Sequence, residues 1–354
     1  MTPPTVSVLI ATHNGGRFLL PALESVLAPR DIPLEVVLVD NAGTDGSVEA
    51  AVARLRDPRL RVVHSPVNTF HAGGLNLALR EARGEFVALM DHDDLSCPGR
   101  LQVELAHLRA HPDLDGVAGF EEEMDGDGNT VAPMFCVRNP AQFLAYSRYD
   151  MPFPMHNLML RRAALEGVPW RPEFSWAMDF DFLQRLFEVR RIGIVPHTVY
   201  RYRVHGGAIS ARRGHGLLHA ATLCRLVAAR RRAGREEGLA ELAPELEEAR
   251  EGTLPPAEQH LRYARRFAEE GFPDLALMLA RRAWAAGCRG ASLAVAACAL
   301  LQLPPERITA VFLWRMALLG PAHALRIESH PPLPPRTWNL LRSHRRDMHA
   351  GVGQ

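Results

Sequence analysis

Short apolar runs alternate with amphipathic segments over the first third of the chain. Four nearly continuous apolar runs have the length of strands that are buried on both faces: residues 6–12, 34–39, 60–64 and 86–90. A segment with helical spacing of apolar residues follows each run: residues 18–27, 47–56, 72–82 and 98–110. This alternation predicts right-handed strand–helix–strand units, and therefore a parallel sheet with helices on both faces.

Polar side chains gather where three of these predicted strands end. Thr12 and His13 follow the first strand, Asp40 ends the second, and the run 91–94 (Asp-His-Asp-Asp) follows the fourth. Ligands collect beyond the carboxyl ends of the strands in such sheets, so we expect these residues to share one site. Like charges about 4 Å apart repel by roughly 4 kcal/mol near a protein surface. The acidic run therefore predicts a positively charged partner.

The regular alternation is lost after residue 120, and the composition changes again near residue 214. Three elements are predicted in between: a hairpin tip at 125–129, a helix at 179–190 and strand-like stretches within 192–204. Beyond 214 the chain is rich in Ala, Leu, Arg and Glu, which predicts helices at 257–270 and 273–286 and a further pair around Pro304-Pro305. The composition thus divides the chain into an α/β part (1–213), a smaller all-helical part (214–329) and an irregular proline-containing tail (330–354).

Composition narrows the possible chemistry of this 354-residue chain. All 41 basic residues are arginine, which excludes lysine Schiff-base chemistry and a phosphate-binding P-loop. The net charge of +1 argues against a dedicated nucleic-acid-binding protein. The 5 cysteines form no Cys-x-x-Cys pair, the first residues lack the features of a signal peptide, and the longest apolar run, 291–301, is of core-helix length. We therefore expect a cytoplasmic protein, at most peripheral at the inner face of a membrane.

Four separated segments carry a family resemblance: VSVLIATHNGGRFLLPALESVL, LEVVLVDNAGTDGS, GEFVALMDHDD and MDFDFLQRLFEVRRIGIVPHTVYRYRVHGGAIS. In this order and spacing they resemble a family-2 glycosyltransferase of the GT-A fold, over about residues 5–210. The resemblance implies a Rossmann-like, mostly parallel central sheet. It also implies transfer of a hexosyl or deoxyhexosyl group, with inversion, from a nucleotide-sugar donor to a saccharide, lipid-linked or protein acceptor. Mn²⁺ or Mg²⁺ would neutralise the departing diphosphate.

The resemblance also assigns roles to residues of this sequence. The donor-binding residues it implies are Thr12, His13, Asn14, Asp40, Asn41, Gly73, Gly74, Asn76, Asp91 and His92. The metal-binding residues it implies are Asp91, Asp93 and His205. Two positions depart from the family pattern, because Asn41 stands where a second acid is common and Met178 stands where a glutamate is usual. Asp94 either supports this acidic run or caps the helix that follows it.

Asp179 matches the catalytic base of the family, which takes the proton from the acceptor hydroxyl. Asp181 is the rival carboxylate, but its spacing from Arg185 also predicts a helical ion pair. Trp170 and Trp176 suit either the core or stacking against a sugar ring, with the core favoured.

Two other functions remain open from the sequence. One is a non-catalytic module that binds a sugar nucleotide or a partner, and the other is a sugar nucleotidyltransferase, against which the missing lysine counts. The helical part could dock the acceptor, form a homo-oligomer or contact a membrane. Its arginine-rich segment 225–235 suits a solvated helix face, with contact to anionic lipid as the alternative.

Overall fold

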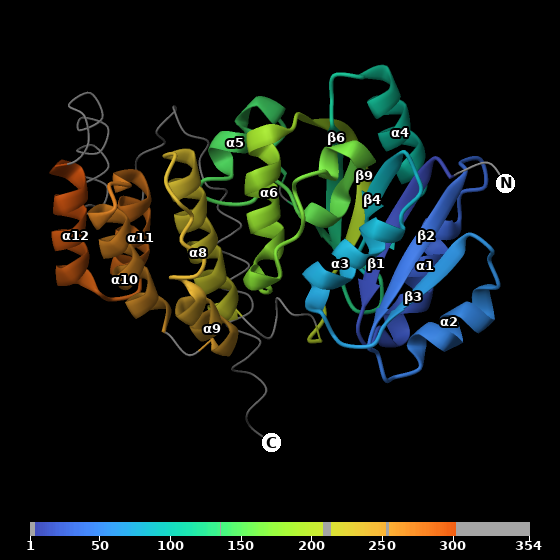
Figure 1. Cartoon of the computed structure of the whole chain (residues 1–354), viewed down its shortest axis with the longest axis horizontal. Coiled ribbons are helices and arrows are strands. Elements are labelled where there is room, and N and C mark those ends of the chain that lie inside the picture. The colour runs from blue at the N-terminus through green and yellow to red at the C-terminus, as the bar shows by residue number, and fades with distance from the viewer. Residues whose placement is uncertain (1–3, 135, 208–213, 253–254, 302–354) are drawn as a thin grey trace.

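The structure, a computed structural model, describes residues 4–134, 136–207, 214–252 and 255–301 (Figure 1). A sheet of nine strands with helices packed on it forms one end of the molecule, and an array of helices forms the other. Neighbouring strands follow the order β3-β2-β1-β4-β8-β6-β9-β5, with β7 paired to β6. The predicted helix pair around Pro304-Pro305 and the predicted tail from residue 330 lie outside the described residues.

One half of the sheet is parallel, as the alternation of strands and helices predicts. Its strands are β1 (Val6–Thr12), β2 (Leu34–Asn41), β3 (Leu60–Ser65) and β4 (Phe86–Leu89). The helices that connect them are α1 (Leu19–Leu27), α2 (Ser47–Leu55) and α3 (Phe70–Glu81). Thr12 lies beside Asp40 in the β1–β2 register, and Asp40 lies beside His64 in the β2–β3 register. The carboxyl ends of these strands therefore meet at one edge of the sheet.

The other half of the sheet contains both strand directions. Its strands are β5 (Leu95–Ser96), β6 (Gly116–Met124), β7 (Thr130–Pro133), β8 (Leu158–Arg161) and β9 (Ile192–Arg203). β8 runs antiparallel to β4 and β6, whereas β6 and β9 are parallel. β6 and β7 form the predicted hairpin, in whose turn Asp125 Oδ1 accepts the main-chain N–H of Asn129 at 2.9 Å. The whole sheet is mixed because β7 and β8 follow β6 without the long crossover helix that parallel pairing requires.

Two hydrophobic cores cover the two faces of the sheet. On one face, Val8 and Ile10 of β1 belong to the core formed with α1, α2 and α4 (Arg100–Ala110). On the other face, Leu9 and Ala11 belong to the core formed with α3 and α6 (Met178–Val189). Successive residues of β1 thus face opposite cores, as the nearly continuous apolar run predicts for a strand that is buried on both sides.

An array of helices follows the sheet in the described chain. Its members are α8 (Gly214–Arg232), α9 (Ala243–Glu251), α10 (Pro256–Glu269), α11 (Pro273–Ala285) and α12 (Arg289–Leu301). The core on the α6 face continues from Phe182 of α6 through Leu223 of α8 and Phe267 of α10 to Ala299 of α12. No helix among the described residues has both the length and the apolar character needed to cross a membrane.

The arginine-rich segment 225–235 contributes to packing inside the protein. Arg225 is 5% exposed and donates from Nη2 to the carbonyl oxygen of Tyr149 at 2.6 Å. Arg230 is 8% exposed and pairs with Glu270, the residue after α10, at 2.7 Å. The predicted solvated face and its lipid-contact alternative are therefore both wrong for Arg225 and Arg230, because their guanidinium groups join α8 to neighbouring segments of the same chain.

Candidate active site

The acidic run 91–94 directly follows β4, which pairs with β1 on one side and with β8 on the other. Buried Arg100 fixes the end of this strand. Its Nη2 donates to the carbonyl oxygen of Leu89 at 2.9 Å and to that of His156 at 3.1 Å. These bonds tie the start of the acidic run to a distant segment of the chain that carries a histidine. The carboxylates of the run then face different partners.

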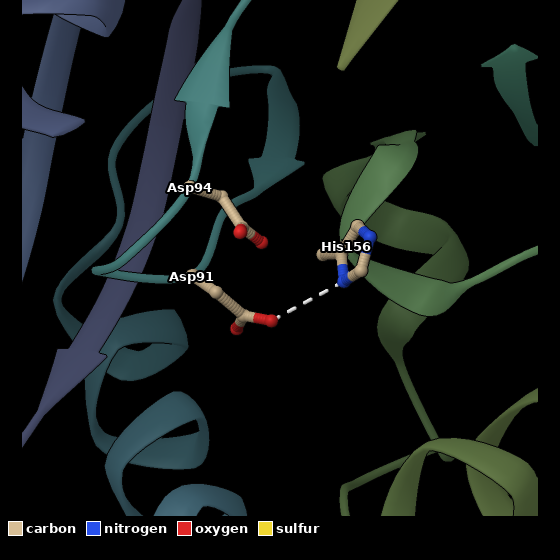
Figure 2. Close-up of side chains that lie close together, drawn as sticks. All are labelled: Asp91, Asp94 and His156. Carbon is tan, nitrogen blue, oxygen red and sulfur yellow. Dashed lines mark ion pairs between the residues drawn. The ribbon is translucent and has the colours of Figure 1, made fainter. Parts of the chain in front are cut away.

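The carboxylate of Asp91 lies between two histidines. His71 Nε2 is 3.4 Å from Asp91 Oδ1, and His156 Nδ1 is 3.2 Å from Asp91 Oδ2 (Figure 2). The main-chain N–H of Asp91 donates to the hydroxyl of Tyr200 at 2.9 Å. Although burial opposes ionisation, the hydrogen bond from His156 and the charge of His71 hold the pKa of Asp91 well below its usual range. Asp91 is therefore an ionised acceptor, and 27% of its side chain is exposed.

His156 connects Asp91 to a second acid deeper in the protein. Its Nε2 lies 3.0 Å from Oε2 of Glu121, a residue of β6 that is 1% exposed. The ring stacks on Tyr200, with centroids 4.4 Å apart and an angle of 18° between the planes. Burial alone would lower the pKa of His156, but the charge of Glu121 and the contacts with both carboxylates hold it well above its usual value. Each ring nitrogen of His156 thus lies within hydrogen-bonding distance of a carboxylate.

Asp93 and His205 form a separate pair at the same edge. His205 Nε2 lies 3.0 Å from Asp93 Oδ2, and both side chains are partly exposed. Ligand atoms at right angles in an octahedral magnesium site, with bonds of about 2.1 Å, also lie about 3.0 Å apart. A carboxylate oxygen and an imidazole nitrogen are suitable donors for Mn²⁺, and the carboxylate also suits Mg²⁺. Two of the three predicted metal ligands are therefore adjacent and fit a divalent cation.

Asp94 is almost fully buried, with 1% exposure, and it supports β9. Its Oδ1 accepts the main-chain N–H of Arg203 at 2.7 Å, while its Oδ2 has no hydrogen-bond partner in the structure. The helix-cap interpretation of Asp94 is wrong, because Gly99 occupies the N-cap of α4 and no side chain caps that helix. Burial raises the pKa of Asp94 well above its usual value.

Asp91, Asp94 and His156 together form a second group that could hold a cation. One possible ligand atom from each residue lies within 4.8 Å of the others. Figure 2 shows the two carboxylates and the imidazole facing one another across a small space. Among the described residues, the structure therefore contains two groups with donor atoms suitable for a metal ion.

The predicted nucleotide-binding residues after β1 lie at this edge as well. His13 is exposed, and its Nδ1 lies 3.0 Å from the carbonyl oxygen of Asn41. Asn14 has a left-handed backbone (φ 60°), and its Oδ1 accepts the main-chain N–H of Thr44 at 2.7 Å. Thr12 Oγ1 is buried and has no hydrogen-bond partner in the structure. These contacts hold the loop after β1 against the loop after β2. The roles of Thr12, His13 and Asn14 in binding the nucleotide-sugar stay predictions.

Asp40 and Asn41 are the last residues of β2, and their side chains contact residues of neighbouring segments. Asp40 is 7% exposed, and its Oδ2 lies 3.1 Å from Nδ1 of His64. Asn41 is 2% exposed; its Oδ1 accepts the main-chain N–H of Thr69 at 3.0 Å and its Nδ2 donates to the carbonyl oxygen of Phe70 at 2.8 Å. The amide of Asn41 therefore holds the start of α3. Direct contact of either residue with the donor stays a prediction.

The two glycines expected to lie against the donor are closely packed within the protein. A Cβ atom at Gly74 would lie 2.7 Å from Cβ of Ala11, so Gly74 allows α3 to approach β1. A Cβ atom at Gly73 would collide with the side chain of Thr69. The space beside both glycines is thus occupied by protein atoms, and their role in donor binding stays a prediction.

Asn76 and His92 complete the predicted donor set. Asn76 Nδ2 donates to the carbonyl oxygen of Trp170 at 2.7 Å, and its Oδ1 accepts the main-chain N–H of the same residue at 3.1 Å. Trp170 is fully buried and stacks on Phe182 at 4.8 Å, which confirms the core interpretation for this tryptophan. His92 is half-buried in the acidic run, where its charge helps to lower the pKa of Asp91.

Asp179 lies in the first turn of α6 and is electrostatically coupled to the acidic run. Burial raises the pKa of Asp179, and the charge of Asp91 raises it further, while His156 and His71 act in the opposite direction. A carboxyl group with a raised pKa is a better proton acceptor near neutral pH. Asp179 is therefore close enough to Asp91, His156 and His71 to interact with them electrostatically, and its role as the base stays a prediction.

Asp181 has a structural position instead. It is 2% exposed and pairs with Arg185 at 2.8 Å and with Arg171. The helical ion pair predicted for Asp181 is therefore confirmed. Asp181 is thus occupied by two arginines, whereas Asp179 pairs with no arginine among the ion pairs of the described residues.

Three site residues were not predicted from the sequence: His71, Glu121 and His156. His156 directly precedes the strand β8 in the sequence, and nothing around it there indicates a site residue. Glu121 is an acid within a strand, and nothing in its neighbourhood indicates a buried histidine as its partner. His71 lies two residues before Gly73, and the family resemblance assigns a donor-binding role to that glycine but not to the histidine.

The match to a known family follows from the same region. The family model described as Glycosyl transferase family 2 matches residues 7–184, which include the strand ends, the acidic run and Asp179. The chain belongs to this family. The resemblance inferred from the four separated motifs is therefore confirmed, and this region is a family-2 transferase domain.

Relatives and solved structures agree with this assignment. The putative glycosyltransferase EpsE of Bacillus subtilis (strain 168) is 36% identical over 221 residues, which are 59% of this chain and 76% of that protein. The S. aureus protein TarS, in a crystal structure with UDP, superposes with a TM-score of 0.57 at 18% identity, covering 86% of this chain and 91% of that one. This likeness confirms the expected GT-A fold.

Some relatives are much longer than the region they share with the transferase domain. An uncharacterised protein of Sinorhizobium fredii is 29% identical over 215 residues, which are only 23% of its length. The succinoglycan biosynthesis protein ExoO of Rhizobium meliloti is 35% identical over 99 residues, 28% of its length. The present chain therefore matches only about a quarter of the length of each of these two relatives.

Proposed function

We propose that this protein transfers a sugar from a nucleotide-diphosphate sugar to an acceptor hydroxyl by a single displacement that inverts the anomeric centre. The observation that carries this proposal is that Asp91 and the Asp93–His205 pair lie at the edge where β1, β2 and β4 end, within electrostatic reach of Asp179. Such an edge is the usual ligand site of an α/β sheet. Membership of the transferase family supports the reaction class.

Asp93 and His205 would hold a divalent cation, Mn²⁺ or Mg²⁺. A bound cation supplies charge neutralisation of the leaving diphosphate. The 3.0 Å between Asp93 Oδ2 and His205 Nε2 is compatible with two ligands of one cation. Phe18 packs against the ring of His205, with centroids 4.7 Å apart. Since the chain has no lysine, the remaining phosphate charge would be met by arginine and main-chain N–H groups.

Asp179 acts as the general base in this proposal. Its carboxylate accepts the proton of the acceptor hydroxyl as that oxygen attacks the anomeric carbon. The main-chain N–H of Phe180 donates to Asp179 Oδ1 at 2.7 Å, which orients the carboxylate and leaves its Oδ2 for the acceptor. Met178, in place of the expected glutamate, is buried and adds no second charge.

The test compares Asp179→Asn with a matched control, Asp113→Asn, which alters an exposed carboxylate. Diphosphate release is measured over a panel of nucleotide-sugars with Mn²⁺, and nucleotide binding is measured by calorimetry. We expect Asp179→Asn to lower kcat about 10²–10⁴-fold with unchanged nucleotide affinity, because a positioned base contributes to the transition state rather than to donor binding. A kcat for Asp179→Asn equal to that of Asp113→Asn would refute the assignment. Wild-type protein that binds nucleotides without turning over any of them would favour the binding module.

The remaining proposals concern place and partners. The free thiols of Cys97, Cys136, Cys224 and Cys288 suit the reducing cytoplasm. The acceptor is a saccharide, a lipid-linked sugar or a protein, and nucleic acid is not among the expected ligands. Peripheral membrane contact and homo-oligomer formation through the helical part stay predictions.

A further inference from the structure

A basic cluster, formed by Arg225, His260 and Arg282, lies among the helices that follow the sheet, and the proposed function does not use it. Arg225 belongs to α8, which lies between α6 and α10 (Figure 1). His260 belongs to α10, and Arg282 belongs to α11. We propose that the basic cluster is a site for an anionic group, phosphate or carboxylate, that the acceptor carries. This inference rests on the proposed function and narrows the chemical class of its acceptor.

Arg225 has one unpaired end on its guanidinium group. Its Nε and Nη2 both donate to the carbonyl oxygen of Tyr149, at 3.1 and 2.6 Å, in the segment after α5 (Phe143–Tyr146). Its Nη1 is buried and has no hydrogen-bond partner in the structure. By contrast, the next arginines along α8, Arg230 and Arg231, pair with glutamates. A buried donor without an acceptor is costly, and carboxylate and phosphate are the acceptors that match a guanidinium group best.

His260 and Arg282 add two further groups without hydrogen-bond partners. His260 is 8% exposed, and neither of its ring nitrogens has a hydrogen-bond partner in the structure. Burial, together with the charges of Arg282 and Arg225, lowers the pKa of His260 to about 4, so its imidazole is neutral near pH 7. Arg282 makes no hydrogen bond to another described side chain. The three side chains are therefore close enough to interact electrostatically, and each keeps donor capacity for a ligand.

The two arginines of the basic cluster form no ion pair with an acid among the described residues. Burial and the charge of Arg282 lower the pKa of Arg225 to about 10. Asp150 attracts both arginines electrostatically but pairs with neither. A bound anion would offset the repulsion between the like charges and occupy the unpaired donors. Arg282 and Asp150 are partly exposed, so the basic cluster extends to the surface, from which an anion could enter.

The position of the basic cluster favours the acceptor as the molecule that carries the anion. The guanidinium group of Arg225 lies over the ring of Phe180, with 4.7 Å from Cζ to the ring centroid. Phe180 directly follows Asp179, the proposed base, in α6. Burial raises the pKa of Cys224, the residue before Arg225, and the charges of Asp181 and Asp179 raise it further. The substrate that a general base contacts is the one whose hydroxyl loses its proton, which is the acceptor.

Calorimetry with inorganic phosphate, on the full chain without metal or nucleotide, tests the site separately from activity. We expect Arg282→Gln to weaken phosphate binding at least about tenfold, because it removes a charged hydrogen-bond donor. The matched control Arg265→Gln changes an exposed arginine of α10 and should leave the phosphate affinity unchanged. Without phosphate, Arg282→Gln should keep or raise the Tm, since it removes the repulsion between two arginines.

His260→Leu provides a second variant that is expected to fold. It removes two ring nitrogens that have no partner in a buried position, so its Tm should be at least that of the wild type. Its phosphate affinity should nevertheless fall, because the imidazole no longer donates to the anion. A residue with a purely structural role would show the opposite combination, a lower Tm and unchanged phosphate binding.

Sugar transfer to three forms of one saccharide acceptor tests the acceptor class: the neutral form, a form with a carboxylate and a phosphate monoester. We expect one of the anionic forms to have a KM at least about tenfold below that of the neutral form, as a hydrogen bond between charged groups provides. Comparison of the two anionic forms identifies the anion. Arg282→Gln should remove this preference, and Arg265→Gln should retain it.

Three results would overturn the inference. Phosphate binding that is absent from the wild type, or that falls equally in Arg265→Gln and Arg282→Gln, would show that the basic cluster is not an anion site. A lower Tm with unchanged phosphate binding in both Arg282→Gln and His260→Leu would make these residues structural. Equal KM values for the neutral and anionic acceptors would separate the site from the acceptor. Failure of the proposed function is distinguishable, because no nucleotide-sugar would then be turned over with any acceptor, while calorimetry would still decide whether the basic cluster binds an anion.

Discussion

The buried contact between Arg100 and Glu104 leads to a quantitative prediction of how stability depends on pH. Both side chains are completely buried, with Arg100 Nε 3.2 Å from Glu104 Oε2. Arg100 also holds the end of β4 and the carbonyl of His156, so the pair lies directly beneath the site. Burial raises the pKa of Glu104 to about 7 from an ordinary value of 4.5, although the charge of Arg100 opposes this shift.

The raised pKa fixes the sign of a pH effect on stability. Between pH 4.5 and about 7 the folded protein retains the proton of Glu104, whereas the unfolded chain releases it. The stabilisation that comes from this retained proton is therefore complete below the pKa of Glu104 in the unfolded chain. It is lost as the pH rises through the pKa of Glu104 in the folded protein. A shift of this size corresponds to about 3 kcal/mol, at about 1.4 kcal/mol for each pKa unit. The variant Glu104→Gln cannot ionise and escapes this loss.

Urea denaturation from about pH 4.5 to about pH 8, followed by tryptophan fluorescence, measures this difference. We expect the free energy of unfolding of Glu104→Gln to gain about 3 kcal/mol relative to the wild type over this range. The control Glu49→Gln removes an exposed carboxylate of α2 and should show no such trend. If Glu104→Gln instead loses stability relative to the wild type as the pH rises, the attraction to Arg100 outweighs the cost of burial and the reasoning is refuted.

Two further substitutions test the packing around α3. Gly74→Ala places a methyl group 2.7 Å from Cβ of Ala11 and should cost about 1–3 kcal/mol in urea denaturation, part of which the second change Ala11→Gly should restore; no recovery would argue against this contact. Phe70 has a left-handed backbone (φ 56°), so Phe70→Gly should be more stable than Phe70→Ala by about 1–2 kcal/mol in the same assay. Equal stability of these two variants would contradict that conformation.

The parallel half of the sheet and the common edge could be predicted from the sequence because both depend on local patterns. A nearly continuous apolar run of strand length predicts a strand buried on both sides, and parallel strands necessarily end at the same edge. The register of Thr12 beside Asp40 confirms that edge for β1 and β2. The placing of Asp93 next to His205 is a longer-range prediction that came from the family resemblance, and the structure brings the two side chains to 3.0 Å.

The contacts that give each acidic residue of the site a different partner could not be predicted from the sequence. They are made by residues that are far apart in the chain. Nothing near Glu121 or His156 in the sequence indicates that the two form an ion pair, since strand pairing and the preceding loop bring them together. The same limit applies to Arg225, whose position in an arginine-rich helix suggested solvent, whereas a carbonyl of a distant loop accepts its hydrogen bonds. Composition reports average exposure, but only the tertiary fold determines which charges become partners.

The continuity of the core between α6 and the helical array has a consequence for engineering this protein. Asp179 lies on α6, and α6 packs against α8, where Cys224 Sγ lies 3.6 Å from the carbonyl oxygen of Ala177, just before α6. Replacing the chain after residue 213 with a foreign module would therefore remove a supporting surface from the helix that carries the proposed base. A working chimera must either supply residues that pack against this surface of α6 or retain α8 from the original chain.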